Sequence, residues 1–370
     1  MIALRLWTPW LLLLTFLTQS GPALAHKASD SFIYLDSDAG ELRIDVALRD
    51  LALLVPLDQN RDRQITGREV RNQRPVITRT VENGLELSAE SGVCRLQGLD
   101  WGLSRHSDGR YAAARYRIVC PDGDDPEQLQ YSLLFDRDSL HRGLVRITSD
   151  SGSTLAVLSP DRNTLPLTSG SSRPLETFTA FLVEGVVHLM IGLDHILFLL
   201  VLVLPVSLMA KGPENDTAKS RILRLAGIVT AFTVAHSVTL ALAALNLVTL
   251  PIAWVETVIA LSIAIAAVNV VWPVLGRKTW KLAFAFGLIH GFGFASVLGD
   301  LTSGVSDLAL ALAGFNLGVE LGQLGLLVLG FPVLCLFSRW RLYQRAVVPA
   351  ILLAVVGMSL VWAAERAAFI

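Results

Sequence analysis

The sequence predicts a multi-domain membrane protein, in which a small, mainly β domain outside the cytoplasm precedes an all-α bundle of six transmembrane helices. Two observations lead to this fold class. Of the 370 residues 52% are hydrophobic, and they concentrate in the second half, where six stretches are each long enough to cross a bilayer. The first half instead alternates apolar and polar residues, as half-buried strands do. A net charge of -1 gives no argument for a nucleic-acid partner, and we expect none.

Residues 1–25 are typical of a signal peptide. A short apolar run is followed by the small residues Ala23-Leu24-Ala25, the pattern of a signal-peptidase site. An uncleaved membrane anchor is the alternative, but the apolar run is short for a span. Cleavage would leave His26 at the N-terminus of an exported domain.

Residues 26–163 are expected to form this β-rich extracytoplasmic domain. Alternating runs, each bounded by Gly, Asp, Pro or Ser, occur at 32–48, 112–119, 130–135 and 144–147. They favour a small antiparallel sandwich over a βαβ arrangement. Residues 164–174 are rich in Ser, Gly and Pro and are expected to form a linker.

Export of this domain bears on the state of its cysteines. Cys94 and Cys120 are expected to form a disulfide, because they would lie in an oxidising compartment and have no histidines nearby to complete a zinc site. Cys335 lies in a late apolar segment. His106 and His141 have Asp, Ser and Arg neighbours, so we expect them on the surface.

Residues 58–69 fit the pattern of an EF-hand calcium loop. Arg63 departs from it, because it replaces the glycine of the sharp turn and adds a positive charge. The alternative is a polar turn before a short helix, with Asp58 as its N-cap. The expected calcium ligands are Asp58, Asn60, Asp62, the carbonyl of Gln64, Thr66 through water, and bidentate Glu69.

Residues 175–370 are expected to form the membrane domain. Its six candidate segments are 178–209, 222–245, 251–275, 280–298, 308–337 and 347–364. The first and fifth are longer than a bilayer requires, so each is expected to tilt or to break near its glycines. Lys and Arg occur in the loops after the first, third and fifth segments, which places those loops in the cytoplasm and the N-terminal domain outside. The location predicted is the bacterial inner membrane, with the lipid bilayer as a partner.

Histidines and carboxylates interrupt these apolar segments. Ionisable residues at bilayer depth are costly and usually serve a site. Helical spacing predicts that Glu184, His188 and His195 share one face of the first segment. The expected metal-binding residues are His188, Asp194, His195, His236, His290, Glu320 and Glu184, supported by the polar residues Ser237, Glu256, Asn269, Asn316 and Gln323.

This donor set suits a divalent first-row transition metal such as Ni, Co, Zn or Cu. The competing interpretation is that each histidine only makes a hydrogen bond between helices. That explanation becomes weaker when four histidines occur in the same pattern.

The motifs that carry these residues resemble the HupE/UreJ family of hydrogenase and urease accessory membrane proteins, in the branch with an exported N-terminal domain. They are His188-x5-Asp194-His195 with Gly192, FTVAHSVTL, the segment 256–269, FGLIHGFGFA and FNLGVELGQ. FTVAHS is also similar to the His-Ser element of nickel/cobalt permeases.

The resemblance implies a nickel or cobalt permease that supplies metalloenzyme assembly, with hydrogenase or urease maturation proteins as partners. It implies that His188, Asp194 and His195 recognise the metal and that His236, His290 and Glu320 complete its path.

Two other classes of protein remain open. The first is an intramembrane zinc hydrolase of ceramidase-like type, with Glu184 or Glu320 as general base and Ser237 beside a zinc-bound histidine. It predicts three imidazoles converging on one point, whereas a transporter predicts polar groups strung along a passage. The second is a metal sensor or accessory protein. We expect a transporter or accessory protein rather than an enzyme, and no ATP-binding P-loop is visible in the sequence.

Overall fold

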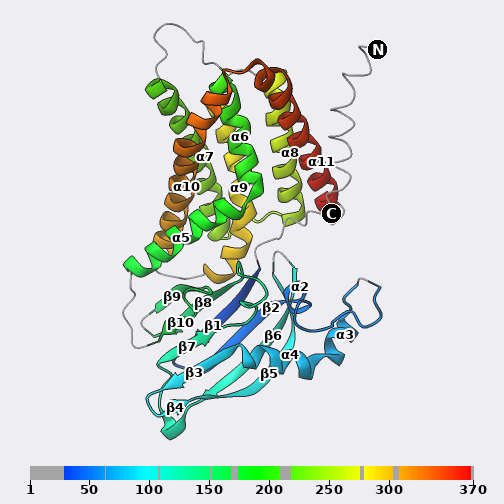
Figure 1. The fold of residues 1–370 in the computed structure, drawn as a ribbon. Coiled ribbons are helices and arrows are strands. Elements are labelled where there is room, and N and C mark those ends of the chain that lie inside the picture. Colours follow the sequence, from blue (N-terminus) through cyan, green and yellow to red (C-terminus); the bar gives the residue numbers. More distant parts are fainter. Residues whose placement is uncertain are drawn as a thin grey trace.

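The computed structural model contains an N-terminal, mainly β part and a C-terminal helical part (Figure 1). The predicted signal peptide and His26 lie outside the described residues. The structure describes residues 29–62, 64–106, 109–150, 152–167, 174–208, 218–275, 279–302 and 308–367, without the side chains of 218 and 294–302.

The larger sheet has six strands in the order β5-β6-β2-β1-β8-β9. All neighbours are antiparallel except β1 and β8, which run parallel. The alternation of apolar and polar residues predicted for 32–48 is present here, since the apolar residues Leu42, Ile44 and Val46 of β2 are buried. The strands are β1 (Asp30–Asp36), β2 (Glu41–Ala47), β5 (Arg95–His106), β6 (Gly109–Val119), β8 (Arg142–Ser149) and β9 (Gly152–Leu158).

The smaller sheet has the order β10-β7-β3-β4 and packs with short helices over one face of the larger sheet. Its strands are β3 (Leu85–Ala89), β4 (Gly92–Val93), β7 (Gln128–Tyr131) and β10 (Thr164–Pro166). The helices are α2 (Leu48–Leu51), α3 (Gly67–Asn72), α4 (Arg74–Asn83) and the 3-10 turn η1 (Pro121–Gly123). Because β10 pairs with β7, the β domain extends beyond residue 163 into the segment expected to be linker.

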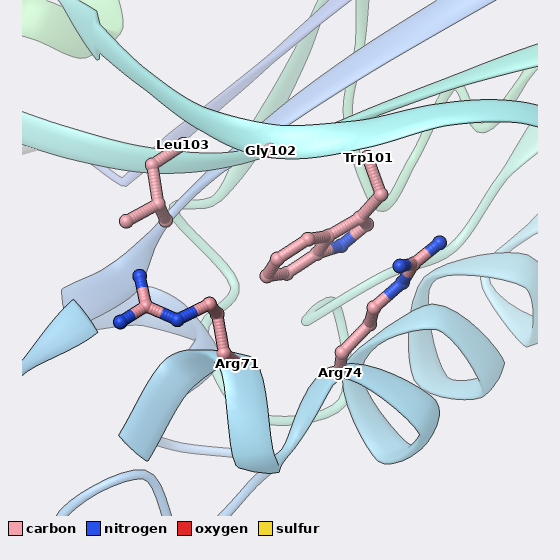
Figure 2. Close-up of a pocket in the computed structure, with 5 residues that line it drawn as sticks. All are labelled: Arg71, Arg74, Trp101, Gly102 and Leu103. Atoms are coloured by element: carbon pink, nitrogen blue, oxygen red, sulfur yellow. The ribbon is translucent and has the colours of Figure 1, made fainter. Parts of the chain in front are cut away.

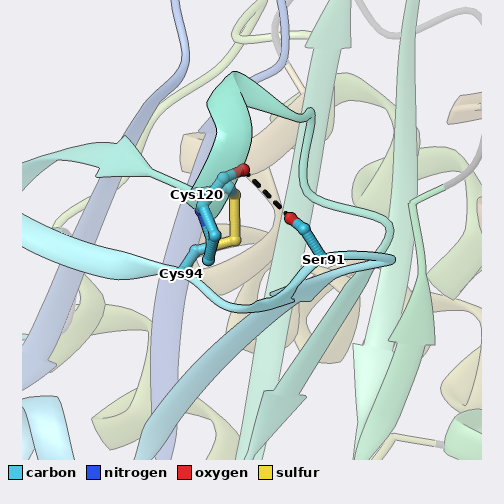
Figure 3. The surroundings of a disulfide bond; sticks show 4 residues. Ser91, Cys94 and Cys120 are labelled. Atoms are coloured by element: carbon cyan, nitrogen blue, oxygen red, sulfur yellow. Dashed lines mark hydrogen bonds between the residues drawn. A yellow bond between two sulfur atoms is a disulfide. The ribbon is translucent and has the colours of Figure 1, made fainter.

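A disulfide joins Cys94 and Cys120, the pair expected from the sequence. It links the two ends of the β5–β6 hairpin (Figure 3). Beside it, the hydroxyl of Ser91 donates a hydrogen bond of 2.9 Å to the carbonyl of Pro121. The disulfide therefore closes the β5–β6 hairpin at the edge of the larger sheet, and the hydrogen bond from Ser91 joins this edge to the β3–β4 turn.

Seven helices occur in the described part of the C-terminal region, followed in Figure 1 from green to red. Five are long and apolar enough to cross a membrane, namely α5, α7, α8, α10 and the helix that includes α11. Their bounds are α5 (Pro174–Ile191), α6 (Leu193–Leu208), α7 (Ala218–Ala244), α8 (Ile252–Val271), α9 (Thr279–Thr302), α10 (Leu308–Phe337) and α11 (Val348–Ala367), with the π turn η2 (Tyr343–Val347) before α11.

The first predicted membrane segment is two helices, α5 and α6, which meet at Gly192. A Cβ at this position would lie 2.7 Å from His195 Nδ1 and 3.0 Å from Asp194 Oδ1, so the side chains after the break need a glycine there. The expectation of a break near glycine is confirmed. Glu184, His188 and His195 were expected on one face of a single helix. The segment is instead divided into α5 and α6, although the rings of His188 and His195 still lie 5.1 Å apart across the break.

The fifth predicted segment is one continuous helix, α10, despite its glycines. Their role is close packing against α5. A Cβ at Gly314 would collide with the carbonyl of Phe178, and one at Gly318 with the carbonyl of Leu182. Small residues let two helix backbones approach in this way.

The second face of the larger sheet covers one end of the helical bundle (Figure 1). Phe32 and Leu144 from the sheet share an apolar cluster with Phe181, Leu240 and Phe315 from α5, α7 and α10. This contact identifies the C-terminal end of α7 and the N-terminal end of α10 as the ends of the bundle near the β domain.

The expectation that His106 and His141 lie on the surface is wrong, because both are buried by long-range packing. His106 Nε2 lies 2.7 Å from Asp45 Oδ2, and its ring stacks on Phe32 at 4.4 Å. His141 contacts the hydroxyl of Tyr131 through Nε2 at 2.6 Å. Burial lowers the pKa of His141 to about 3, so its ring is neutral in the folded protein.

Candidate metal site in the helical bundle

Four histidines from four helices meet in the helical bundle. They are His188 of α5, His195 of α6, His236 of α7 and His290 of α9. The ring of His195 is central: its centroid lies 5.1 Å from that of His188, 5.4 Å from that of His290 and 6.3 Å from that of His236. His195, His236 and His290 are at most 5% exposed. The packing thus gathers residues about 100 positions apart.

Asp194 fixes the protonation of His195 at the start of α6. Its Oδ1 lies 3.0 Å from His195 Nδ1 and also accepts the backbone N–H of His195 at 2.9 Å. A carboxylate oxygen can only accept, so the ring proton belongs on Nδ1. The other nitrogen, Nε2, is left with a free lone pair, and it is buried without a hydrogen-bond partner.

Asn316 of α10 holds the ring proton of His236 on Nδ1 in the same way. The amide nitrogen of Asn316 donates to the carbonyl of Leu312 at 2.8 Å, which identifies the oxygen as the atom facing His236. This oxygen lies 3.1 Å from His236 Nδ1 and accepts its proton. His236 Nε2 is again buried without a partner.

Ser262 of α8 is the acceptor for the ring proton of His290. Its hydroxyl donates to the carbonyl of Ile259 at 2.7 Å, so only its lone pairs remain for His290 Nε2, 3.2 Å away. His290 Nε2 therefore carries the proton, and Nδ1 is the buried nitrogen that has no hydrogen-bond partner among the described side chains. Ser262 was not among the predicted site residues, although its lone hydroxyl in the apolar run IALSIAIAA is a usable signal.

The three histidines together present three buried, unprotonated ring nitrogens. An imidazole whose other N–H is held by an acceptor is the usual state of a metal ligand. Among the described residues, however, no three His, Cys, Asp or Glu side chains form a ready metal site. Two imidazoles bound to one tetrahedral ion have ring centroids roughly 5 Å apart. The ring of His195 lies 5.4 Å from that of His290 and 6.3 Å from that of His236, so both separations are slightly above that value.

The structure does not bring the other two predicted carboxylates to the histidines. Glu184 accepts two hydrogen bonds, of 3.1 and 3.2 Å, from Arg142 of β8. Glu320 accepts a hydrogen bond of 2.7 Å from Thr230 of α7. Glu184 thus joins the bundle to the β domain, one turn before His188.

The other polar residues predicted to support the metal site form hydrogen bonds with groups other than the histidines. Gln323 accepts a hydrogen bond from Thr233 at 3.1 Å, so it faces α7 as Asn316 does. The hydroxyl of Ser237 donates to the carbonyl of Thr233 on its own helix at 2.7 Å. On α8, Asn269 accepts the N–H of Leu275 near the helix end, and the backbone carbonyl of Glu256 accepts from Arg366.

Phe198 and Phe232 lie against the histidines, and Phe286 packs on Phe198; this feature was not predicted from the sequence. Phe198 follows the histidine of α6 by three residues, and Phe232 and Phe286 precede those of α7 and α9 by four. The rings of Phe198 and Phe232 lie 5.3 Å from each other, and 5.5 and 5.3 Å from that of His290. Since the C-terminal end of α7 meets the β domain, these rings close the opposite side of the histidine cluster.

The predicted calcium loop is a separate feature of the β domain. The N–H of Asp62 donates to side-chain oxygens of Asp58 and Asn60, and the N–H of Gln64 to Asp62. Hydrogen bonds from Thr66 hold Glu69 and lower the pKa of its carboxyl. The loop oxygens therefore turn inward onto backbone N–H groups. Position 63 lies outside the described residues, and the N-cap of α3 is Thr66 rather than the Asp58 of the alternative interpretation.

The sequence profile of a known family, described as HupE / UreJ protein, matches residues 166–366, more than half of the chain. The matched range includes all four histidines, Asp194, Asn316 and Ser262. No curated protein sequence matches the chain significantly.

Proposed function

Because the chain belongs to the HupE/UreJ family, we propose that it is a multi-pass membrane protein that carries a divalent transition metal across the bacterial inner membrane. Nickel is the favoured ion, with cobalt or zinc as alternatives. The β domain lies outside the cytoplasm, and the ion supplies metalloenzyme assembly through hydrogenase or urease maturation proteins.

The observation that carries this proposal is the set of three buried ring nitrogens on His195, His236 and His290. Leaving a buried acceptor unsatisfied costs about 1 to 3 kcal/mol. A dehydrated cation bound by two or three of these nitrogens offsets that cost. Imidazole with a nearby carboxylate suits Ni, Co, Zn or Cu better than Ca or Mg.

Charged and apolar side chains lie on the two sides of the histidines. On the side of the β domain, Arg142 and Glu184 form an ion pair at the boundary between the two parts. On the opposite side, the rings of Phe198, Phe232 and Phe286 occlude the cluster. An apolar barrier lies on the side of the β domain as well, because the ring of Phe315 lies 5.3 Å from that of His188 and belongs to the apolar cluster shared with the sheet. Helix movement must therefore open both barriers for an ion to pass.

The zinc hydrolase is the weaker candidate. It needs imidazoles that already converge on one ion and a base or nucleophile beside them. The described residues contain no such preformed set. The hydroxyl of Ser237 donates to its own helix, and Glu320 is hydrogen-bonded to Thr230.

Cellular accumulation of trace nickel tests the proposal, with cobalt, zinc and copper measured in parallel at matched protein abundance. His195→Ala and His236→Ala should reduce uptake of the transported ion to background. Ser237→Ala is the matched control beside His236, and it should retain uptake. Absence of protein-dependent uptake for every metal would exclude transport, and loss of function in Ser237→Ala together with bound zinc would favour the hydrolase.

For the loop of residues 58–69 we propose calcium as the ligand, supported by the inward turn of its oxygens and by the EF-hand spacing. Calcium should raise the thermal unfolding temperature of the full chain, and Glu69→Gln should abolish that rise. An equal rise in the variant would contradict the assignment.

A further inference from the structure

A cleft on the β domain lies apart from the histidine cluster and borders α3, the helix that begins within the loop of residues 58–69. It is formed between α3, α4 and β5 and has a volume of about 430 Å³ (Figure 2). Arg71 and Arg74 come from the two helices, while Trp101, Gly102 and Leu103 come from the strand that faces them. This volume is within the range of small-molecule sites, about 300 to 1,000 Å³.

The cleft combines two positive charges with an apolar wall. Neither Arg71 nor Arg74 forms an ion pair with any acidic side chain that the structure describes. The guanidinium of Arg74 instead lies 5.3 Å from the centre of the Trp101 ring. Trp101 and Gly102 are half-buried, and Leu103 on the other side of the cleft is exposed. The cleft is thus built from two unpaired cations around an exposed apolar surface.

We propose that this cleft binds a small organic anion with at least two carboxylate groups, either free or as a chelate of a divalent metal. Each guanidinium is a planar fork that pairs with a carboxylate through two hydrogen bonds. Two such groups on separate helices match two carboxylates on one molecule. The ring of Trp101 and the side chain of Leu103 contact the carbon skeleton between them.

The size and openness of the cleft limit the ligand. Among the described residues, five line the cleft, which suits a small molecule rather than the extended backbone of a nucleic acid. Because both arginines are exposed, water and salt screen their charges. We therefore expect a dissociation constant on the order of 10 to 1,000 µM, with a clear dependence on ionic strength.

Equilibrium dialysis of the full chain in nanodiscs tests this site, with radiolabelled citrate as the probe. The double variant Arg71→Gln, Arg74→Gln should weaken citrate binding at least about tenfold. Arg79→Gln, which removes a charge from α4 outside the cleft, is the matched control and should stay within about twofold of the unmodified protein. Equal thermal unfolding temperatures for the three proteins establish that any loss is not unfolding.

A second arm compares citrate with its nickel complex. Tighter binding of the complex identifies the metal chelate as the ligand, and equal binding identifies the free carboxylate. Either result supports the cleft. No binding of either probe, or equal weakening by Arg79→Gln, would overturn the proposal. Because the assay compares citrate binding between the unmodified protein and variants of the cleft, its outcome is independent of whether the helical bundle transports metal.

Discussion

The hydrogen bond from His236 to Asn316 gives a sharp test of the metal site. Asn316→Leu keeps the branched arrangement of four side-chain heavy atoms at this buried position but removes the oxygen that accepts the Nδ1 proton. The proton is then free to move to Nε2, the nitrogen required for the metal. Loss of such a supporting partner typically weakens metal binding 10- to 100-fold, or about 1.4 to 2.8 kcal/mol. We expect a loss of this size in nickel affinity.

Gln323→Leu is the matched control for this variant. It makes the same amide-to-Leu change on α10, at a position that is also buried and faces α7, but its partner is Thr233 rather than a histidine. Thr233 keeps a second hydrogen-bond acceptor in the carbonyl of Val229. Nickel affinity in Gln323→Leu should therefore change by less than about threefold.

Asn316→Asp tests whether the hydrogen-bond acceptor, and not the shape of the side chain, is what the metal site requires. Its carboxylate still accepts the Nδ1 proton of His236, so nickel affinity should remain close to that of the unmodified protein or increase. Affinity is measured by isothermal titration of the purified full chain, and transport by nickel uptake at matched abundance. Equal losses in Asn316→Leu and Gln323→Leu, or full affinity in Asn316→Leu, would refute the role assigned to Asn316.

Three further predictions concern stability. Gly318→Leu drives a side chain into the backbone of α5 and should lower the unfolding temperature of the membrane domain sharply, whereas Gly330→Leu, which has open space, should not. The pKa of His141 is about 3 in the folded protein, and its ordinary value is 6.5. Between these two pH values, the unfolded chain binds a proton at His141 that the folded chain does not. The stability of the β domain should then fall as the pH drops through this window, by up to about 1.4 kcal/mol per pH unit, and His141→Gln should flatten the slope measured by urea unfolding. Reduction of the Cys94–Cys120 disulfide should cost about 3 kcal/mol in the same assay; an unchanged midpoint in dithiothreitol would contradict this.

Much of the architecture could be predicted because its signals are local. Alternation of apolar residues marks β2, and long apolar runs mark the helices of the C-terminal part. The contact between Asp194 and His195 is also local, since the two are neighbours in the chain. The break at Gly192 had a sequence signal as well. In each case the physical cause lies within a few residues, so one sequence is enough to reveal it.

The partners of the remaining site residues could not be predicted in the same way. Helical spacing shows which residues share a face, as Asn316 and Gln323 do, but not what that face meets. That Asn316 reaches His236 while Glu320 reaches Thr230 depends on how α10 and α7 cross. Ser262 meets its histidine only because α8 packs beside α9.

The sequence by itself determined the two-part organisation, the apolar helices and the set of polar residues that those helices contain. Only the tertiary structure decided that four histidines meet around His195, that Glu184 pairs with Arg142 instead, and that His106 and His141 are buried. The physical reason is the separation along the chain between the residues that interact. Local periodicity specifies elements and their faces, whereas contacts between elements depend on close approaches such as that of Gly318 to α5, which depend on both helices at once.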